Sequence, residues 1–296
     1  YRLVIDYSNG LLSNILPMLL EDMGVEAVAL NGMSTEASAK THDVASSSLS
    51  KIVGPMECDL GIHLHPAGEK LTIVTRDGLA IGPQQLLLAA AELTWRAHPK
   101  STIAVPITAT SRVEDLAKSH DGHVLRVKSD HLSMMQAAAK GDVVLVAGTR
   151  GGFIFPGWQR GADAACALAN ILELLARSGA ELDVLVAGVE PGQFADAIVP
   201  CQWRHKGALM RKILEESAAM PRQMIDGVRL QVNATWLWIA PDRRNAHCRS
   251  QAEADTREQA TRTLTEWAAN MAAWRTELEQ KTLHETVAPS HTTMHA

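Results

Sequence analysis

The chain has 296 residues, of which 46% are hydrophobic and 21% are charged, a balance typical of a folded globular protein. This length predicts two or three domains of roughly 100–150 residues each. The net charge of −5 and the aromatic content of 4% argue against a nucleic-acid-binding surface. No apolar run reaches the ~18 residues of a membrane span, and no signal peptide is apparent, so we expect a cytoplasmic protein without a membrane partner. The four cysteines form no CxxC pair and are expected to be reduced and buried.

The first third of the chain predicts strands that alternate with helices. Strands are expected at residues 2–6, 25–30, 58–64 and 71–75. Apolar residues at helical spacing follow the first strand and end at Gly24, and a second helix is expected over residues 84–96. The Ser/Thr-rich stretch 31–51 is expected to be a surface segment.

The second third repeats this alternation. Strands are expected at 102–106, 123–127 and 142–147, and helices at 111–119, 130–140 and 161–177. A short helix is expected at 182–187, where the pattern alone would also suit a strand. Ser111 with Glu114 forms the pattern of a capping box, and Asp130 is the expected N-cap of the next helix. Alternating strands and helices predict mainly parallel sheets covered on both faces.

The last third changes character, because its strands and helices no longer alternate. Strands are expected at 197–202, 228–232 and 235–240, and helices at 206–217 and 252–278. We therefore expect an α/β protein with two α/β/α sandwich domains (residues 1–99 and 100–190) and a small C-terminal α+β domain (191–278). The polar residues 279–296 are expected to form a disordered tail.

One stretch, residues 61–75, is a candidate metal site. It predicts a strand, a short polar loop and a second strand, with His65 at the end of the first strand and Glu69 in the loop. These two side chains could hold a divalent cation, but two ligands make a weak site, and a polar turn without a ligand is the alternative. His63 and His65 are also spaced to lie on one face, yet zinc needs a third protein ligand, and no HExxH or CxxC motif supplies one.

Several segments follow one another in the order of a known enzyme family. They are YRLVIDYSNG, LPMLLEDMGVEAVALN, GIHLHPAGEKL, VPITATS, GGFIFP, VPCQWRHKGALMRKILEE and IDGVRL. With these segments the chain resembles the phosphohexomutase superfamily of phosphomannomutases and phosphoglucomutases. The resemblance implies that this chain starts at the family's second domain, without the first domain and its phosphorylatable serine. It also implies that Ser8 is not that serine.

The resemblance further implies that the functional loops are altered. The family's metal loop, Asp-x-Asp-Gly-Asp-Arg, corresponds to residues 65–70. There His65 and Ala67 stand in place of two aspartates, and Glu69, with its longer side chain, stands in place of the third. Mg²⁺ prefers oxygen ligands, so its affinity is expected to be poor. The family's sugar loop, Gly-Glu-x-Ser-Gly, corresponds to residues 148–152. Its candidate sugar-binding residues are Thr149, Arg150, Gly151 and Gly152. Arg150 could contact a phosphate or could simply be solvated.

The family's phosphate loop, Arg-Pro-Ser-Gly-Thr-Glu-Pro, corresponds to residues 240–246. Arg243 and Arg244, together with Lys70, are the candidate phosphate-binding residues, and the negative charge of Asp242 would oppose an anion there. An exposed turn without a ligand is the alternative.

The resemblance implies a module of sugar-phosphate metabolism whose partner is a hexose 1- or 6-phosphate. Because the loops are altered, we expect no mutase turnover and no cofactor, or Mg²⁺ if activity survives. The segments VIDYSNG and WLWIAPDRRNAHCRS resemble mutase-like regions that are fused to mannose-1-phosphate guanylyltransferases more than they resemble free-standing mutases. A regulatory or scaffold role beside such a sugar-1-phosphate nucleotidyltransferase, in nucleotide-sugar biosynthesis, is therefore expected. The alternative is an active, divergent phosphohexomutase.

Overall fold

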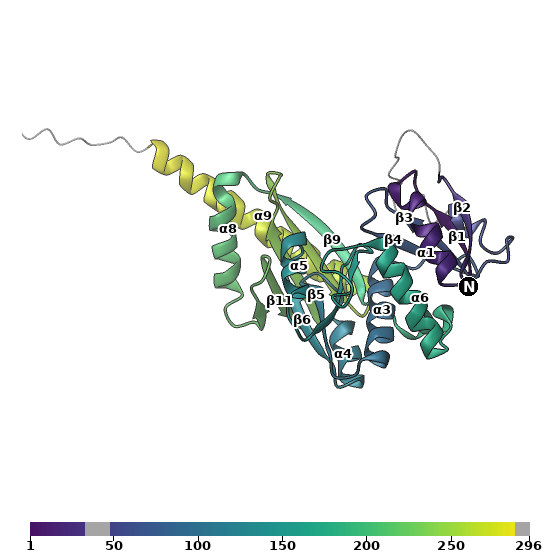
Figure 1. The fold of residues 1–296 in the computed structure, drawn as a ribbon. Helices are drawn as coiled ribbons and strands as arrows, with labels where there is room; N and C mark the ends of the chain where they lie inside the picture. Colours follow the sequence, from purple (N-terminus) through teal and green to yellow (C-terminus); the bar gives the residue numbers. More distant parts are fainter. Residues whose placement is uncertain (33–47, 288–296) are drawn as a thin grey trace, which may run out of the picture. The chain divides into compact units, whose positions relative to one another are not determined.

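The structure is a computed structural model that describes residues 1–32 and 48–287, with side chains up to residue 280 (Figure 1). The chain divides into two compact units, Tyr1–Pro191 and Gly192–Ala296, which are described separately. Most of the expected surface segment 31–51 lies outside the described residues. None of the described helices combines the length and the apolar character of a membrane span.

The first sheet of the first unit is mainly parallel. Its strands are β1 (Arg2–Asp6), β2 (Glu26–Leu30), β3 (Leu60–Leu64) and β4 (Leu71–Thr75), in the order β2-β1-β3-β4. β1 is parallel to β2 and β3, whereas β4 is antiparallel to β3. The 3-10 helix η1 (Leu11–Asn14) and α1 (Leu16–Asp22) connect β1 to β2.

The second sheet has the same topology. Its strands are β5 (Thr102–Pro106), β6 (His123–Val127), β7 (Val143–Ala147) and β8 (Phe153–Ile154), in the order β6-β5-β7-β8. Again the first three are parallel and the edge strand is antiparallel. The connecting helices are α4 (Arg112–Ser119) and α5 (His131–Ala138), and α6 (Ala164–Ser178) and α7 (Leu182–Gly188) follow β8.

Helix α3 (Pro83–Ala97) lies in the middle of this unit. Every residue from Leu86 to Trp95 is buried, so the helix is covered on all sides. It packs against α4, α6, α7 and β7, that is, against elements that follow it in the chain. One hydrophobic cluster joins residues of both sheets, such as Ile62 and Ile103, with helix residues such as Leu168 of α6. The expected domain boundary at residue 99 therefore lies just after a helix whose contacts are with elements of the following segment, residues 100–190.

The second unit is an antiparallel α+β structure. Its strands are β9 (Gln193–Pro200), β10 (Arg222–Gln223), β11 (Val228–Val232), β12 (Thr235–Pro241) and β13 (His247–Ala254), in the order β10-β11-β12-β13-β9. Helices α8 (Trp203–Glu216) and α9 (Arg257–Val287) pack on this sheet around Leu209, Leu237 and Trp267. Two α/β sheet layers followed by an α+β unit confirm the predicted fold class.

Two local predictions are wrong at the C-terminal end. The helix expected from residue 252 begins at Arg257, because residues 247–254 form β13 between β12 and β9. The sequence of β13, HCRSQAEA, is poor in the β-branched and aromatic residues that usually mark a strand, so only its position between two partners shows it. Helix α9 also continues through Val287 into the expected tail, and residues 288–296 lie outside the described residues.

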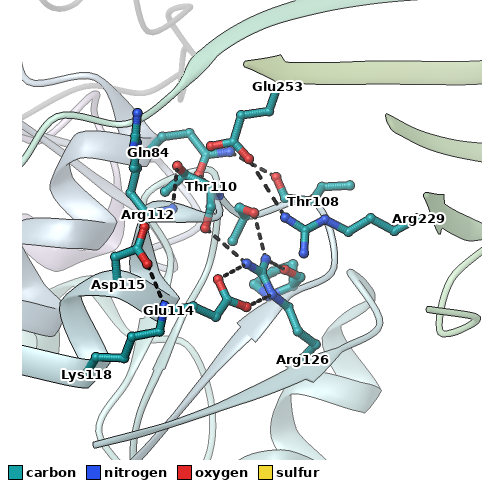
Figure 2. A network of polar contacts seen from close by, with 12 residues as sticks. Gln84, Thr108, Thr110, Arg112, Glu114, Asp115, Lys118, Arg126, Arg229 and Glu253 are labelled. Atoms are coloured by element: carbon teal, nitrogen blue, oxygen red, sulfur yellow. Dashed lines mark hydrogen bonds and ion pairs between the residues drawn. The ribbon is translucent and has the colours of Figure 1, made fainter. Parts of the chain in front are cut away.

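The expected capping box of α4 does not form. Ser111 is at the N-cap position, but its side chain makes no capping hydrogen bond. The Glu114 carboxylate instead binds Arg126, whose Nε and Nη2 lie 2.8 and 2.6 Å from the two carboxylate oxygens (Figure 2). By contrast, Asp130 caps α5 as predicted, since its side chain accepts a hydrogen bond from the Ser133 N–H.

Candidate functional site

Two of the predicted loops meet in the first unit. The β3–β4 connection, residues 65–70 (the 65–70 turn), lies against the β7–β8 connection, residues 148–152 (the 148–152 turn). Leu71 N donates to the carbonyl of Gly151 at 3.0 Å, and Ala164 N at the start of α6 donates to the carbonyl of Gly68 at 2.8 Å. Backbone hydrogen bonds thus hold together segments about 80 residues apart.

Glycines shape the 148–152 turn. Gly151 has φ +78°, and a Cβ there would lie 2.3 Å from the carbonyl oxygen of Leu71. Gly148 N closes the turn by donating to the carbonyl of Gly152 at 2.8 Å. Gly151 therefore has a structural reason to be glycine, independent of any ligand.

The 65–70 turn holds a single carboxylate, that of Glu69. His65 Nδ1 accepts a hydrogen bond from the Ala67 N–H of its own turn at 3.3 Å. Glu69 Oε2 lies 3.5 Å from Nε2 of His131, the first residue of α5. Among the described residues, no group of three or more His, Cys, Asp or Glu side chains could hold a metal ion. His131 is missed by sequence reasoning, because nothing marks an exposed histidine at a helix start as a neighbour of a turn 60 residues earlier.

His63, in strand β3 just before this turn, has a buried hydrogen-bond partner. Its Nε2 lies 2.7 Å from Oγ of Ser8, and both side chains are buried. The Asp6 carboxylate, also buried, accepts hydrogen bonds from Ser8 N and Asn31 Nδ2 at 2.9 Å each. His63 thus has a polar partner in the core and His65 has one in its own turn. The two histidines form no zinc site with other described residues.

The cationic side chains of the two turns have no polar partner among the described residues. Arg150 is exposed and Lys70 is partly exposed, and neither side chain forms a hydrogen bond or an ion pair in the part of the chain that the structure describes. Lys70 Cγ lies beside Gly152, 3.7 Å from where a Cβ would be, so Lys70 packs along the neighbouring turn. Thr149 is half-buried. These residues leave positive charge available to an anion.

The 240–246 turn of the second unit already contains an anion, the carboxylate of Asp242. Its Oδ1 accepts hydrogen bonds from Arg244 N and Asn245 N, both at 2.8 Å, and from Asn245 Nδ2 at 3.2 Å. The hydrogen bond from Arg244, followed by those from Asn245 and the nearby His247, lowers the pKa of Asp242. Successive backbone N–H groups in a turn are a typical anion-binding arrangement. Here they are occupied by the chain's own side chain.

The side chain of Lys206 binds the backbone of the 240–246 turn. The sequence alone did not indicate this residue. Its Nζ donates to the carbonyls of Asp242 and Asn245, both at 2.6 Å, and lies 3.4 Å from the ring centre of Trp203. Arg243 lies 3.3 Å from Asp226, and Arg244 is exposed. Lys206 is therefore a structural cation, and one of the two predicted phosphate-binding arginines already has a carboxylate partner.

Comparisons with known proteins agree with this architecture. Residues 82–191 match the family model "Phosphoglucomutase/phosphomannomutase, alpha/beta/alpha domain III", a match that begins with α3. A probable phosphoglucosamine mutase of Pyrococcus horikoshii is 24% identical over 274 residues, which cover 89% of this chain and 60% of the relative. A phosphoglucomutase/phosphomannomutase family protein of Burkholderia thailandensis has a similar fold, with a TM-score of 0.78 at 20% identity over 92% of this chain and 60% of that one. Residues 82–191 match domain III of the phosphoglucomutases and phosphomannomutases, and the chain is similar to phosphohexomutases along most of its length.

The chain spans about 60% of the length of the curated relatives it matches. Another similar structure is that of Aspergillus fumigatus N-acetylphosphoglucosamine mutase in complex with GlcNAc-6P and magnesium, with a TM-score of 0.67 at 13% identity over 93% of this chain and 62% of that one. The 65–70 turn does not fit magnesium. Mg²⁺ requires several oxygen ligands in near-octahedral geometry, whereas this turn offers only Glu69, which lies beside His131.

Proposed function

We propose that this phosphohexomutase module binds hexose phosphates without interconverting them and serves as a regulatory or scaffold part beside a sugar-1-phosphate nucleotidyltransferase. The observation that carries the proposal is the single carboxylate of the 65–70 turn, which leaves no set of oxygen ligands for a hard cation. Phosphoryl transfer depends almost wholly on positioning and on stabilising charge, so a turn without a metal gives it little support.

The two turns of the first unit are the proposed binding surface for the phosphate. Lys70 and Arg150 belong to turns that the backbone hydrogen bond from Leu71 N to Gly151 O joins, and neither side chain has a partner among the described residues. An arginine can bind two phosphate oxygens at once, which favours Arg150 as the main contact. Thr149 and the backbone of Gly151 and Gly152 would then lie next to the sugar.

The 240–246 turn is a poorer candidate for a phosphate. The Asp242 carboxylate takes the backbone N–H groups of Arg244 and Asn245 that an anion would use. A phosphate would have to displace this carboxylate and would meet its negative charge. Arg243 and Arg244 therefore act, in this proposal, only as general positive charge.

A second candidate function is an active, divergent mutase. It is favoured by the similarity to a probable phosphoglucosamine mutase over 89% of this chain, and by Glu69 and Lys70, which remain in the 65–70 turn. In that case Mg²⁺ would be required, and Glu69 would be indispensable.

The experiment that separates the two candidates is a coupled mutase assay with mannose 1-phosphate, glucose 1,6-bisphosphate and Mg²⁺. We expect no turnover above background. Turnover that disappears in Glu69→Ala would overturn the non-catalytic proposal in favour of the mutase.

Binding is measured separately by calorimetry with mannose 6-phosphate. We expect saturable binding that Arg150→Ala abolishes and that Arg257→Ala, a change at an exposed arginine of α9, leaves intact. No heat in the wild-type chain would overturn the ligand-binding part and leave the scaffold role. That role predicts co-elution with a purified mannose-1-phosphate guanylyltransferase in size-exclusion chromatography, and separate elution would contradict it.

A further inference from the structure

We infer that the first unit contains a second ligand site, a cavity lined by Lys140, Arg160, Arg177 and Trp158, whose chemistry fits a nucleotide. The cavity has a volume of about 490 Å³, which lies within the usual range of small-molecule sites. Its walls are the C-terminal end of α3, the α5–β7 connection, the segment after β8 and one face of α6. None of these residues belongs to the 65–70 or the 148–152 turn.

The position of the cavity separates it from the proposed sugar-phosphate surface. Val143 and Val144 at the start of β7 line it, whereas the 148–152 turn follows the end of the same strand. The two places therefore lie at opposite ends of β7.

The charge of the lining favours an anion. The side chains of Lys140 and Arg160 form no hydrogen bond or ion pair with other described residues. Arg177 lies 3.2 Å from Glu173, which is the only carboxylate among the lining residues. The lining thus contains three cationic side chains and one carboxylate, in a chain whose net charge is −5. A phosphate group would supply the missing negative charge and accept hydrogen bonds from ammonium and guanidinium groups.

The apolar part of the lining favours a planar ring beside that phosphate. Trp158 lines the cavity with 72% of its surface exposed, which is unusual for so large an apolar side chain. Phe155, Val143 and Leu174 are buried and supply apolar side chains to the wall. An indole face open to solvent can stack on a base, and stacking of this kind tolerates different bases. A ligand with both a phosphate and a base matches the lining better than either group alone.

The test is calorimetry on the full chain with ADP, adenosine and inorganic phosphate as probes. We expect saturable ADP binding that is at least about tenfold tighter than binding of adenosine or phosphate. We also expect ADP to quench tryptophan fluorescence in the wild-type chain but not in Trp158→Leu. Both Trp158→Leu and Arg160→Gln should weaken ADP binding about tenfold or more.

The matched control is Arg211→Gln, which removes the same charge from an exposed position on α8 in the other unit and should leave ADP binding unchanged. Trp158 and Arg160 are exposed, so these variants should fold, and equal thermal melting curves check this. The inference is overturned if ADP does not bind, if phosphate alone binds as tightly as ADP, or if Trp158→Leu and Arg160→Gln bind ADP as the wild type does. The sugar-phosphate proposal is unaffected by any of these outcomes, because it is tested with Arg150→Ala and mannose 6-phosphate.

Discussion

At the scale of single residues, Asp242 decides what the 240–246 turn can bind. Three hydrogen-bond donors converge on its Oδ1, two of them backbone N–H groups, and Lys206 fixes the carbonyls of the same turn from the other side. The backbone is therefore arranged to bind an anion and is held in that arrangement by a buried cation. The turn has the geometry of an anion site, and its own Asp242 carboxylate is the anion.

We predict that Asp242→Ala creates phosphate binding at this turn. Without the carboxylate, the N–H groups of Arg244 and Asn245 become available, and a negative charge next to the site is removed. Calorimetry with inorganic phosphate should detect binding at least about tenfold tighter than in the wild type. Asp196→Ala, which removes the same charge from an exposed position on β9, should not gain it. Equal affinity in both variants would mean that net charge, and not the turn, governs the effect.

A second residue-scale prediction concerns the thiol of Cys248. Burial, and then the neighbouring Cys201, raises the pKa of Cys248 from 9.0 to about 12. Between these two values the unfolded chain has lost the thiol proton and the folded chain keeps it, so unfolding releases a proton. The free energy of unfolding therefore falls as the pH rises through this window.

Urea unfolding of the wild type and of Cys248→Ala at about pH 8 and about pH 10 measures this effect. The stability deficit of the variant should shrink by roughly 1 kcal/mol at the higher pH, because the variant lacks the titrating thiol. Val228→Ala, a neutral truncation in the same cluster, should show the same deficit at both values. A Cys248→Ala deficit that does not change with pH would contradict the assigned pKa shift.

At the scale of elements, Arg126 ties β6 to the loop between β5 and α4. Its guanidinium binds the Glu114 carboxylate and donates to the carbonyls of Pro106, Ala109 and Thr110 (Figure 2). The Gln84 side chain of α3 binds the same loop through Thr108 O and Thr110 N, at 3.1 and 3.0 Å. The segment VPITATS, one of those that carry the family resemblance, is thus held from two sides.

We predict that Arg126→Met lowers the free energy of unfolding by about 3 kcal/mol, because it leaves a carboxylate and three carbonyls without their buried partner. The Arg126 side chain is only 5% exposed, so water cannot replace it without rearrangement. Lys118→Met is the control, since the Lys118–Asp115 pair is 76% and 61% exposed and should contribute little to stability. Urea unfolding of both variants measures the difference. Equal losses in the two variants would show that the Arg126 network contributes no more than a surface pair.

The contact between the 65–70 and 148–152 turns gives a further prediction. Gly151→Ala places a Cβ 2.3 Å from the Leu71 carbonyl at φ +78°, so the two turns must separate. We expect a loss of more than about 2 kcal/mol and, with it, loss of mannose 6-phosphate binding. Gly161→Ala has open space around the new Cβ and should change stability by no more than about 0.5 kcal/mol. Thermal melting and calorimetry of the two variants test both effects, and a Gly151→Ala chain as stable as Gly161→Ala would contradict this account.

The same elements show how far the sequence could predict the structure. Local signals succeed in some places and fail in others: Asp130 caps α5 and residues 182–188 form a short helix, whereas the capping box at Ser111 does not form. β13 could not be predicted, because its pairing with β12 and β9 compensates for a sequence with weak strand preference. For the 240–246 turn, the sequence indicates only that the negative charge of Asp242 would oppose an anion. It does not indicate the hydrogen bonds that the Asp242 carboxylate accepts, because these depend on backbone geometry. The approach of His131 to Glu69 depends on packing between distant segments and left no local pattern.

At the scale of the whole molecule, the two units differ in how their cores are composed. The buried cluster of the second unit consists of residues between Ala195 and Met271, which all belong to that unit. In the first unit, one cluster runs through both sheets, and α3 supplies a continuous buried stretch of it. The repeated sheet topology therefore does not produce two independent cores.

We predict that this difference in core composition decides which fragments fold. A fragment of residues 192–296 should fold alone, because folding buries its own apolar residues against one another. A fragment of residues 100–191 should not fold, because without α3 it loses the buried residues from Leu86 to Trp95 against which α4, α6, α7 and β7 pack. The fragment of residues 1–191, which keeps α3 and both sheets, should fold.

Circular dichroism with urea titration measures all three fragments. We expect cooperative transitions for 192–296 and 1–191, and a broad, non-cooperative change for 100–191. Extending the 100–191 fragment at its N-terminus, so that it begins at residue 82, where the match to the domain III family model begins, restores α3 and should restore a cooperative transition. A cooperative transition for 100–191 would mean that the residues after α3 form a sufficient core, and that the shared cluster contributes little to folding. Because the 82–191 fragment differs from 100–191 only by α3 and its link to β5, the comparison isolates the contribution of that helix.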